Sequence, residues 1–371
     1  MQNALIAQIP MYTNKFLYVH FMPYISIVIP LYNAQSHISR FVNCLQRQSL
    51  YDFEALFIDD ASTDDSAAIV EGIASSDTRF KLLKHSTNLG AGAARNNGIR
   101  AAKGETLCFA DPDDLLPENS LELRYKAYKQ HNAIVRACHV EHAGDGSILY
   151  HEFRPPRFPE ICKPSEAAHQ FGTNPFVCAH WTWLFPTRML QRLGIYNEEN
   201  MRTAEDITFL IHLFFHISRV TWIPDVVYHW VKRDESLSNR FYTVQHYLDY
   251  LRCVELFYEK AKGNKKIVLG DSLFNDYLSC YIPHVLKQAI QNKSTETDLR
   301  TVIARALDIN SRYDVLGRYE RPIRQSPMQY VGFFRLWHAL QDPSSSFLER
   351  LVNGQNIISK FSQMAVDVRN G

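Results

Sequence analysis

The chain of 371 residues is longer than one minimal domain and long enough to bury a sizeable core. Its 46% hydrophobic and 21% charged residues are those of an ordinary globular protein, and the net charge of +1 argues against a nucleic-acid partner, which normally selects a basic surface. The seven cysteines form no CxxC pair, which favours reduced thiols in a cytoplasmic setting over a disulfide framework. The sequence has no run of about 20 apolar residues and therefore predicts no membrane-spanning helix.

Residues 1–22 precede the first strongly patterned segment. They have neither a clean apolar core nor a small-residue cleavage site, so they do not resemble a signal peptide. We interpret them as an extension outside the core fold.

The next part of the chain alternates between apolar, strand-like runs and segments with helical spacing. Strands are predicted at 24–33, 53–58, 80–84, 106–110 and 133–140, with helices between them at 34–48, 64–74, 90–102 and 118–131. This β-α alternation is typical of a mostly parallel sheet with right-handed crossovers and helices on both faces. In such a sheet, ligands bind in the crevice outside the carboxyl ends of the strands.

The predicted strand at 106–110 runs directly into three carboxylates, Asp111, Asp113 and Asp114. Carboxylates cannot enter a dry core without a large desolvation cost, so we expect them where the strand emerges. Asp111 and Asp113 are placed to converge on a hard divalent cation, which would clamp a diphosphate. The alternative is a solvated acidic turn, since Asp-Pro-Asp-Asp is also good turn chemistry. A second acidic pair at the end of the strand at 53–58 favours a functional site.

Beyond residue 140 the pattern changes from regular alternation to a mixture that becomes mainly helical. The segment 144–164 has the composition of a long surface connection, and the aromatic stretch at 180–185 is short. The further elements predicted are a helix at 206–217, strands at 219–222 and 226–230, and helices at 244–262, 270–291 and 296–308.

Two further segments carry an ambiguous signal. Residues 88–98 superficially resemble a dinucleotide-binding fingerprint, but Arg95 replaces its third glycine and the motif follows the third strand. The small residues there suit either close approach to a nucleotide, with Arg95 aimed at phosphates, or packing of a helix on the sheet. Glu205 and Asp206 begin an apolar helix, where acids either interact with the helix dipole or supply a general base.

Taken together, these segments resemble the family 2 glycosyltransferases, which are inverting enzymes with a GT-A fold. The matching segments, in chain order, are Ile29–Asn33, Ile58–Asp64, Asn88–Gly90, Ala94–Gly98, Phe109–Asp114, Glu205–Asp206 and Val227–Ser236. The resemblance covers residues 24 to about 240. This sequence departs from the family at Ala110, Pro112 and Ala204, where the family often carries Leu, Ser and Gly.

The resemblance implies a role for each matched position. The residues implied to bind the nucleotide-sugar are Pro30, Tyr32, Asn33, Asp59, Asp60, Arg95, Asp111, Arg233 and Ser236. Among them, Asp59 or Asp60 would contact the uracil, while Arg233 and Ser236 would close over the diphosphate. A divalent ion, Mn²⁺ or Mg²⁺, would be held by Asp111 and Asp113. Asp206 would be the base that deprotonates the acceptor hydroxyl as UDP leaves in a single displacement.

The resemblance also implies a domain organisation and an acceptor. We expect an N-terminal extension at 1–22, a GT-A domain at 23–240 and a helical region at 241–371. The implied acceptor is a glycan or glycolipid of the bacterial cell surface, as in lipopolysaccharide, lipooligosaccharide or capsule synthesis. A cytoplasmic enzyme with that acceptor would work at the inner membrane face. The basic and aromatic segment at 321–337 suits either peripheral membrane contact or a packing helix.

Two other classes of function stay open on the residues alone. A sugar nucleotidyltransferase also uses a metal and a nucleotide, but it would carry a glycine-rich loop where this chain has residues 30–33. A non-catalytic module that binds nucleotides or glycans would not need the Asp206 carboxylate. The sequence specifies neither the transferred sugar nor the oligomeric state.

Overall fold

The computed structural model describes most of the first two thirds of the chain and part of the remainder. The described residues are 22–151, 160–162, 180–232, 243–263 and 294–313, with Val285 and Ala289. The strands are β1 (Ile25–Leu31), β2 (Phe53–Asp59), β3 (Phe80–Lys84), β4 (Thr106–Phe109), β5 (Ile134–His142), β6 (Ile148–His151), β7 (Ile161–Cys162), β8 (Trp183–Pro186) and β9 (Val220–Val231). The helices are α1 (Gln35–Gln46), α2 (Ser66–Ser76), α3 (Ala91–Ala101), α4 (Ser120–His131), α6 (Thr187–Leu193), α7 (Glu205–Phe214), α8 (Val244–Gly263) and α12 (Glu296–Tyr313), with the 3₁₀ turn η2 (His180–Thr182).

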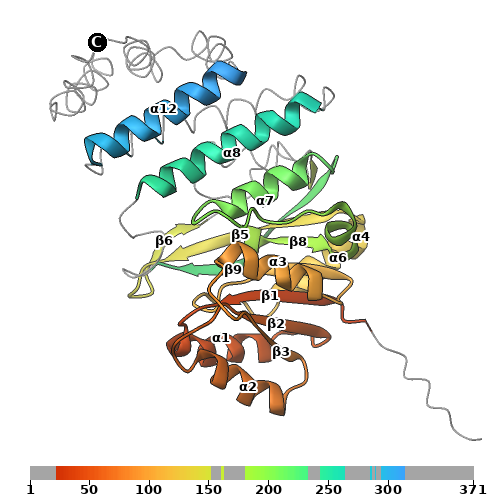
Figure 1. The fold of residues 1–371 in the computed structure, drawn as a ribbon. Helices are drawn as coiled ribbons and strands as arrows, with labels where there is room; N and C mark the ends of the chain where they lie inside the picture. Colours follow the sequence, from red (N-terminus) through yellow and green to blue (C-terminus); the bar gives the residue numbers. More distant parts are fainter. Residues whose placement is uncertain are drawn as a thin grey trace, which may run out of the picture.

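In the described part of the chain the strands form one nine-stranded sheet, drawn across the middle of Figure 1. Its main path runs β3-β2-β1-β4-β8-β5-β9-β7, and β6 pairs with β5. The pairs β3-β2, β2-β1, β1-β4 and β5-β9 are parallel, whereas β8 is antiparallel to both β4 and β5. The prediction of an α/β fold with a mostly parallel core is confirmed.

In the second half, one element was not predicted and two differ from the sequence-based predictions. The aromatic stretch at 180–185 contributes β8, which lies between β4 and β5 in the sheet. The segment 144–164 is not simply a surface connection, because it supplies β6 and β7. The two strands predicted at 219–222 and 226–230 are one strand, β9, whose pairing with β5 contains register shifts.

Helices cover both faces of the sheet, because successive strand side chains point to opposite sides. Val28 of β1 packs in a core with α3, α7 and α8, whereas Ile27 and Ile29 pack in a second core with α1 and α4. The small-residue helix α3 lies very close to β1: a Cβ on Gly98 would come within 2.2 Å of a Val28 methyl carbon. Tight packing on the sheet therefore accounts for glycine at this position of the 88–98 segment.

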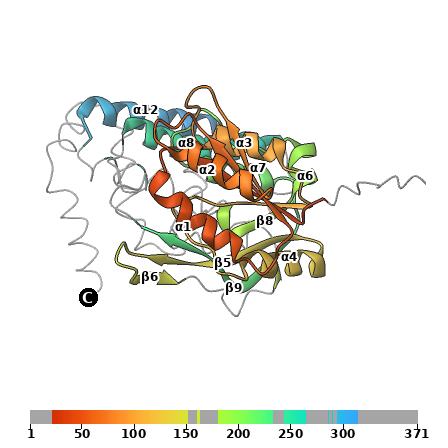
Figure 2. The same cartoon turned by 90° about the horizontal axis from the view of Figure 1, so that it is seen from below.

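Helices α7, α8 and α12 lie one beyond another on the side of the sheet away from α1 and α2, as Figure 1 shows. The view from below in Figure 2 shows α8 and α12 side by side. Leu251 and Val254 of α8 belong to the same core cluster as Phe209 of α7. The predicted boundary near 240, the segment 321–337 and most of the predicted helix at 270–291 lie outside the described residues. None of the helices described here is long and apolar enough to cross a membrane.

Candidate active site

The two acidic strand ends lie at the same edge of the sheet. β1 is flanked by β2 and β4, both parallel to it, with Leu31 paired to Asp59 and Val28 paired to Phe109. Because parallel strands present their carboxyl ends at one edge, the acids that follow β2 and β4 are neighbours of the residues that follow β1. The predicted gathering of both acidic groups at one edge is confirmed by this topology.

The loop after β1 is tied to the loop after β2 by Asn33. The residue has φ of 49°, in the left-handed region, which Asn adopts more readily than most residues. Its Oδ1 accepts a hydrogen bond from the Thr63 backbone N–H at 2.8 Å, and its own N–H donates to Ser62 Oγ at 3.0 Å. Pro30 is half-buried and Tyr32 is 51% exposed. This loop therefore presents Tyr32 at the surface on a backbone that Asn33 fixes.

Asp59 and Asp60 are both buried and hydrogen-bonded to the chain. Asp59 Oδ1 accepts the Ser62 backbone N–H at 3.2 Å. Both oxygens of Asp60 accept backbone N–H bonds from the loop before α3, from Leu89 at 2.8 Å and from Gly90 at 2.7 Å. Asp60 therefore fixes the entry to α3, and a uracil contact for either acid stays a prediction.

The three acids after β4 have different surroundings. Asp114 is buried, and it accepts bonds from the Tyr228 hydroxyl at 2.8 Å and the Val231 backbone N–H at 2.9 Å. Burial, reinforced by the charges of Asp113 and Asp111, raises the pKa of Asp114 well above its ordinary value. The Tyr228 hydroxyl also accepts the Asp111 backbone N–H at 3.0 Å. Asp114 thus ties the acidic loop to β9, while Asp111 and Asp113 are only half-buried.

Arg95 joins this loop to the start of α7. Its guanidinium is buried, with one nitrogen 3.0 Å from Asp111 Oδ1 and another 2.5 Å from Glu205 Oε1. Burial alone would lower the pKa of Arg95, but the Asp111 and Glu205 carboxylates raise it above its ordinary value. Arg95 is therefore a permanent positive charge between two acids, and its predicted contact with the nucleotide stays a prediction.

Asp206 stands next to that bridge, in the first turn of α7. It is half-buried, and its Oδ1 accepts the Ile207 backbone N–H at 2.8 Å. Burial, helped by the charge of Glu205 and opposed by that of Arg95, raises the pKa of Asp206 to about 7. A carboxylate with a pKa near neutrality is suited to accept a proton at physiological pH.

The residue before this acidic pair is in an unusual conformation. Ala204 has φ of 60°, and the sequence carries Ala where the family often has Gly. Glycine adopts this region freely, whereas an L-residue with a Cβ is disfavoured there. The backbone conformation of the turn that precedes α7 is thus locally unfavourable. Contacts with the surrounding structure must stabilise it.

The residues predicted to hold a metal fit a site shared with the donor. Among the residues that the structure describes, no three His, Cys, Asp or Glu side chains converge as a ready metal cluster. Asp111 and Asp113 offer hard carboxylate oxygens, and one oxygen of Asp111 is engaged by Arg95. Two carboxylates completed by diphosphate oxygens and water are a donor set that Mg²⁺ uses. Arg233 and Ser236, predicted to close over the diphosphate, lie outside the described residues.

Sequence reasoning singled out most of this edge and missed two of its supports. Tyr228, which holds the backbone of Asp111 and the carboxylate of Asp114, lies in the matching segment Val227–Ser236, but the sequence assigned it no role. Asp249 of α8, which accepts backbone N–H groups from the segment before α7, lies beyond the motifs that the family shares. Contacts of this kind between distant segments leave no signal in spacing or periodicity.

A solved structure with the same architecture assigns the fold class. The chain is similar to the crystal structure of S. aureus TarS residues 1–349 in complex with UDP-GlcNAc, with a TM-score of 0.53, 19% sequence identity and coverage of 80% of this chain and 92% of that one. The sheet and its helices are therefore a GT-A type fold.

The sequence comparisons find similarity to glycosyltransferases. Residues 26–194 match the model of Glycosyl transferase family 2. The chain is 24% identical to "Uncharacterized glycosyltransferase EpsJ" of Bacillus subtilis over 325 residues, which cover 85% of this chain and 90% of EpsJ. It is also 24% identical over 234 residues to the poly(ribitol-phosphate) beta-N-acetylglucosaminyltransferase TarS of Staphylococcus aureus, over 62% of this chain and 39% of TarS. Residues 26–194 of the chain are thus similar to a family 2 glycosyltransferase domain, and the relatives that match it over more of its length are named glycosyltransferases.

Proposed function

We propose that the protein is a metal-dependent, inverting glycosyltransferase that moves a sugar from a UDP-sugar to a hydroxyl of a growing bacterial cell-surface glycan. One observation supports this most directly. The carboxyl group of Asp206, with its pKa near 7, lies beside Glu205, which the Arg95 bridge links to Asp111 at the end of β4. The bridge links the start of α7 to the end of β4, which supports Asp206 as the proton acceptor for a donor bound at that strand end.

The donor and the acceptor are proposed from the relatives. The similar TarS structure contains UDP-GlcNAc, and TarS is named for transfer of N-acetylglucosamine to poly(ribitol-phosphate). A uridine diphosphate sugar and a bacterial surface polymer are therefore the substrate classes that we expect for this chain. The family match also favours sugar transfer over nucleotidyl transfer, which was the main alternative on the sequence.

The reaction is a single displacement at the anomeric carbon. Asp206 accepts the proton of the acceptor hydroxyl, whose oxygen forms a bond to that carbon as the bond to the UDP oxygen breaks. The anomeric configuration inverts, and the proton passes from Asp206 to solvent. Asp111 and Asp113 would hold a divalent ion, whose positive charge would offset the charge that grows on the departing diphosphate. Arg95 holds Glu205 and Asp111 in fixed positions relative to Asp206.

The proposal also places the enzyme on the cytoplasmic side of the inner membrane, where a glycolipid acceptor would be reached by peripheral contact. Full-length protein should then float with anionic vesicles, and replacement of Arg321 and Arg324 by Gln should weaken this binding. If the parent and the double variant bind vesicles equally, segment 321–337 does not contact the membrane through these arginines. The alternative, a helix that packs against the protein, would then be favoured.

A panel of UDP-sugars tests the central proposal. We expect one or a few donors to release UDP only slowly alone, faster with an extract of surface glycan, and not at all after chelation by EDTA unless Mn²⁺ is restored. Proton NMR of the product should show inversion at the anomeric carbon. Metal-independent release would remove the metal from the proposal, and a retained configuration would contradict the single displacement.

A further inference from the structure

Helix α8 holds the segment that leads into the catalytic acids. Asp249 is buried on α8, and its Oδ2 accepts the backbone N–H groups of Arg202 at 2.7 Å and of Thr203 at 3.1 Å. Its other carboxylate oxygen accepts a bond from the Gln245 side-chain amide at 2.7 Å. Both oxygens of Asp249 are thus used, and two of its three partners are backbone groups immediately before Ala204.

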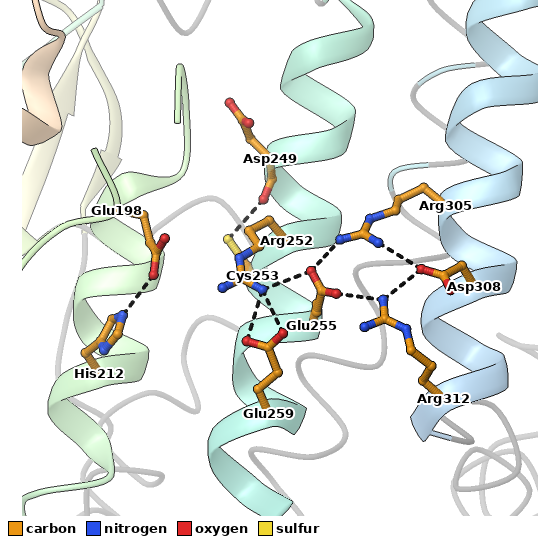
Figure 3. Close-up of polar contacts among 10 residues, drawn as sticks. All are labelled: Glu198, His212, Asp249, Arg252, Cys253, Glu255, Glu259, Arg305, Asp308 and Arg312. Atoms are coloured by element: carbon orange, nitrogen blue, oxygen red, sulfur yellow. Dashed lines mark hydrogen bonds and ion pairs between the residues drawn. The ribbon is translucent and has the colours of Figure 1, made fainter. Parts of the chain in front are cut away.

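The neighbouring contact on α8 reaches Ala204 itself. The Sγ atom of Cys253 lies 3.7 Å from the Ala204 carbonyl oxygen and 3.4 Å from that of Asp249. Figure 3 shows Asp249 and Cys253 one turn apart on α8, joined by the second of these contacts. Residues 202–204 are therefore held in succession by one short stretch of α8.

These contacts bear on an unfavourable backbone conformation near the site. An alanine is disfavoured in the left-handed region, and Ala204 is the residue from which α7 begins. If the segment were released, the turn would relax toward ordinary backbone angles and rotate the first turn of α7. Asp206 would then move relative to Arg95 and Asp111, and displacement of a reacting group by about 1 Å can cost on the order of 100-fold in rate.

We propose that Asp249 is a positioning residue for the general base: it fixes the left-handed turn at Ala204 and so sets the direction of Asp206. The inference rests on the proposed role of Asp206. It gives part of the C-terminal helical region a function in transfer, through a helix that lies outside the segment matched by the family model. The donor-binding residues on β1, β2 and β4 are not touched by Asp249.

A second buried carboxylate on α8 offers a matched control. Glu255, one and a half turns further along, contacts Arg305 and accepts a bond from Arg312 at 2.6 Å, both on α12. It also accepts a bond from Arg252 of its own helix at 2.9 Å. Figure 3 shows Glu255 with Arg305 and Arg312 on the side of α8 that faces α12. Loss of Glu255 should therefore weaken helix packing without reaching the turn at Ala204.

Four variants of the full chain test the inference: Asp249→Ala, Asp249→Asn, Glu255→Gln and Asp249→Ala combined with Ala204→Gly. Asp249→Ala should lower kcat at least roughly tenfold, while the KM for the donor and the Kd for UDP stay within about twofold. Asp249→Asn keeps the shape and one acceptor oxygen, so it should lose less. Glu255→Gln should lower the melting temperature and leave kcat of the folded enzyme close to the parent value.

The double variant provides the most specific readout. Glycine adopts the left-handed turn without the penalty of a Cβ, so Ala204→Gly should restore part of the kcat lost in Asp249→Ala. A residue that only stabilises the fold would not show this rescue. If Asp249→Ala does not fold, Asp249→Asn with and without Ala204→Gly carries the same comparison.

The outcomes separate the two proposals. Normal kcat in both Asp249 variants, or a loss matched by Glu255→Gln and not rescued by glycine, overturns the positioning role. Asp206→Asn is measured alongside: if it also turns over normally, the proposed base is wrong and the inference falls with it. If Asp206→Asn is inactive while the Asp249 variants are normal, only the positioning role fails.

Discussion

The two halves of the sheet bring their acids to the site in different ways. In the half formed by β3, β2, β1 and β4, the acids directly follow their own strands, and the parallel pairing aligns those strand ends. In the half formed by β8, β5 and β9 with α7 and α8, the acids are placed by contacts between distant segments. Arg95 and Glu205 are 110 residues apart, and Asp249 and Arg202 are 47 apart.

In the first half, the positions of the acids follow from local sequence patterns. In the second half, they depend on contacts between segments that are far apart in the chain. The acids also differ chemically. Asp60 is buried but accepts two backbone N–H bonds and lies 2.8 Å from His85, so its carboxylate is well compensated. Asp206 accepts one bond from its own helix, and burial beside Glu205 raises its pKa to about 7. Asp60 is therefore held by several hydrogen-bond partners, whereas Asp206 in the second half is suited to exchange protons.

The largest expected effect separates the halves by function. Asp206→Asn keeps the size of the side chain and its bond to the Ile207 N–H, but it removes the proton acceptor. Transfer should fall on the order of 100-fold or more, while the Kd for UDP measured by calorimetry stays near the parent value. Donor binding that weakens in parallel with transfer would instead place Asp206 in the donor site.

Glu205→Gln is the matched variant for that experiment. It weakens one contact of Arg95 and removes a charge that raises the pKa of Asp206. Its loss of transfer should stay below about tenfold, because the base itself remains. Equal losses of transfer in Asp206→Asn and Glu205→Gln would mean that both carboxylates are needed together, and that Asp206 alone is not the base.

The next prediction concerns the metal that we propose for the first half. Asp113→Ala should weaken UDP binding roughly 10- to 100-fold in Mn²⁺ buffer, because one of two protein carboxylates at the diphosphate is lost. The same variant should respond little to EDTA, whereas the parent should lose affinity on chelation. Asp145→Asn, at the turn between β5 and β6, serves as a control for removal of an acid elsewhere. UDP affinity that is unchanged by EDTA in the parent would refute the metal role.

The first half of the fold could be predicted in detail because its signals are local. Four apolar strands alternate with helices, and a strand covered on both faces must be apolar throughout, as β1 and β2 are. The acids at the ends of β2 and β4 could be predicted as well, because each group directly follows its own strand in the sequence. What remained ambiguous was the small-residue helix α3, where the contact between Gly98 and Val28 shows that packing was sufficient to explain glycine.

The second half resisted prediction for physical reasons. β8 has only the four residues Trp183–Pro186, too few for periodicity to distinguish a strand from another buried segment. The irregular pairing of β9 with β5 made one strand resemble two. Ala204 gives no sign of its left-handed backbone, because the residue type normally avoids it. The Arg95 bridge joins segments whose contact depends on the whole sheet.

A pH series tests whether Asp206 titrates near neutrality. Since the pKa of Asp206 is about 7, the base becomes protonated as the pH falls, and the transfer rate at pH 6 should be about tenfold below that at pH 8. Stability should show the opposite sign. The neutral form is favoured in the folded protein, so this stabilisation is present below about pH 4 and is lost as the pH rises to 7.

Asp206→Asn isolates that stability effect. The melting temperature of the variant relative to the parent should increase between pH 4 and 7 and then stay constant, because Asn does not ionise. Asp145→Asn again serves as the control. A constant difference across the pH range would mean that the pKa of Asp206 is not raised by folding.

The smallest expected effect compares the same backbone conformation in the two halves. Ala61, after the acids of β2, has φ of 59°, and Ala204, before the acids of α7, has φ of 60°. Glycine removes a left-handed penalty of about 1–2 kcal/mol but costs about 0.5–1 kcal/mol in unfolded-chain entropy. Ala61→Gly and Ala204→Gly should therefore each raise the free energy of unfolding by about 0.5–1 kcal/mol in urea titrations. Ala68→Gly, at an exposed position inside α2, should lower it by about 1 kcal/mol. Equal gains at 61 and 204, with transfer unchanged in both, would show that the two turns carry the same local strain. A loss at 204 alone would mean that its turn relaxes without Cβ, so that α8 does not hold it.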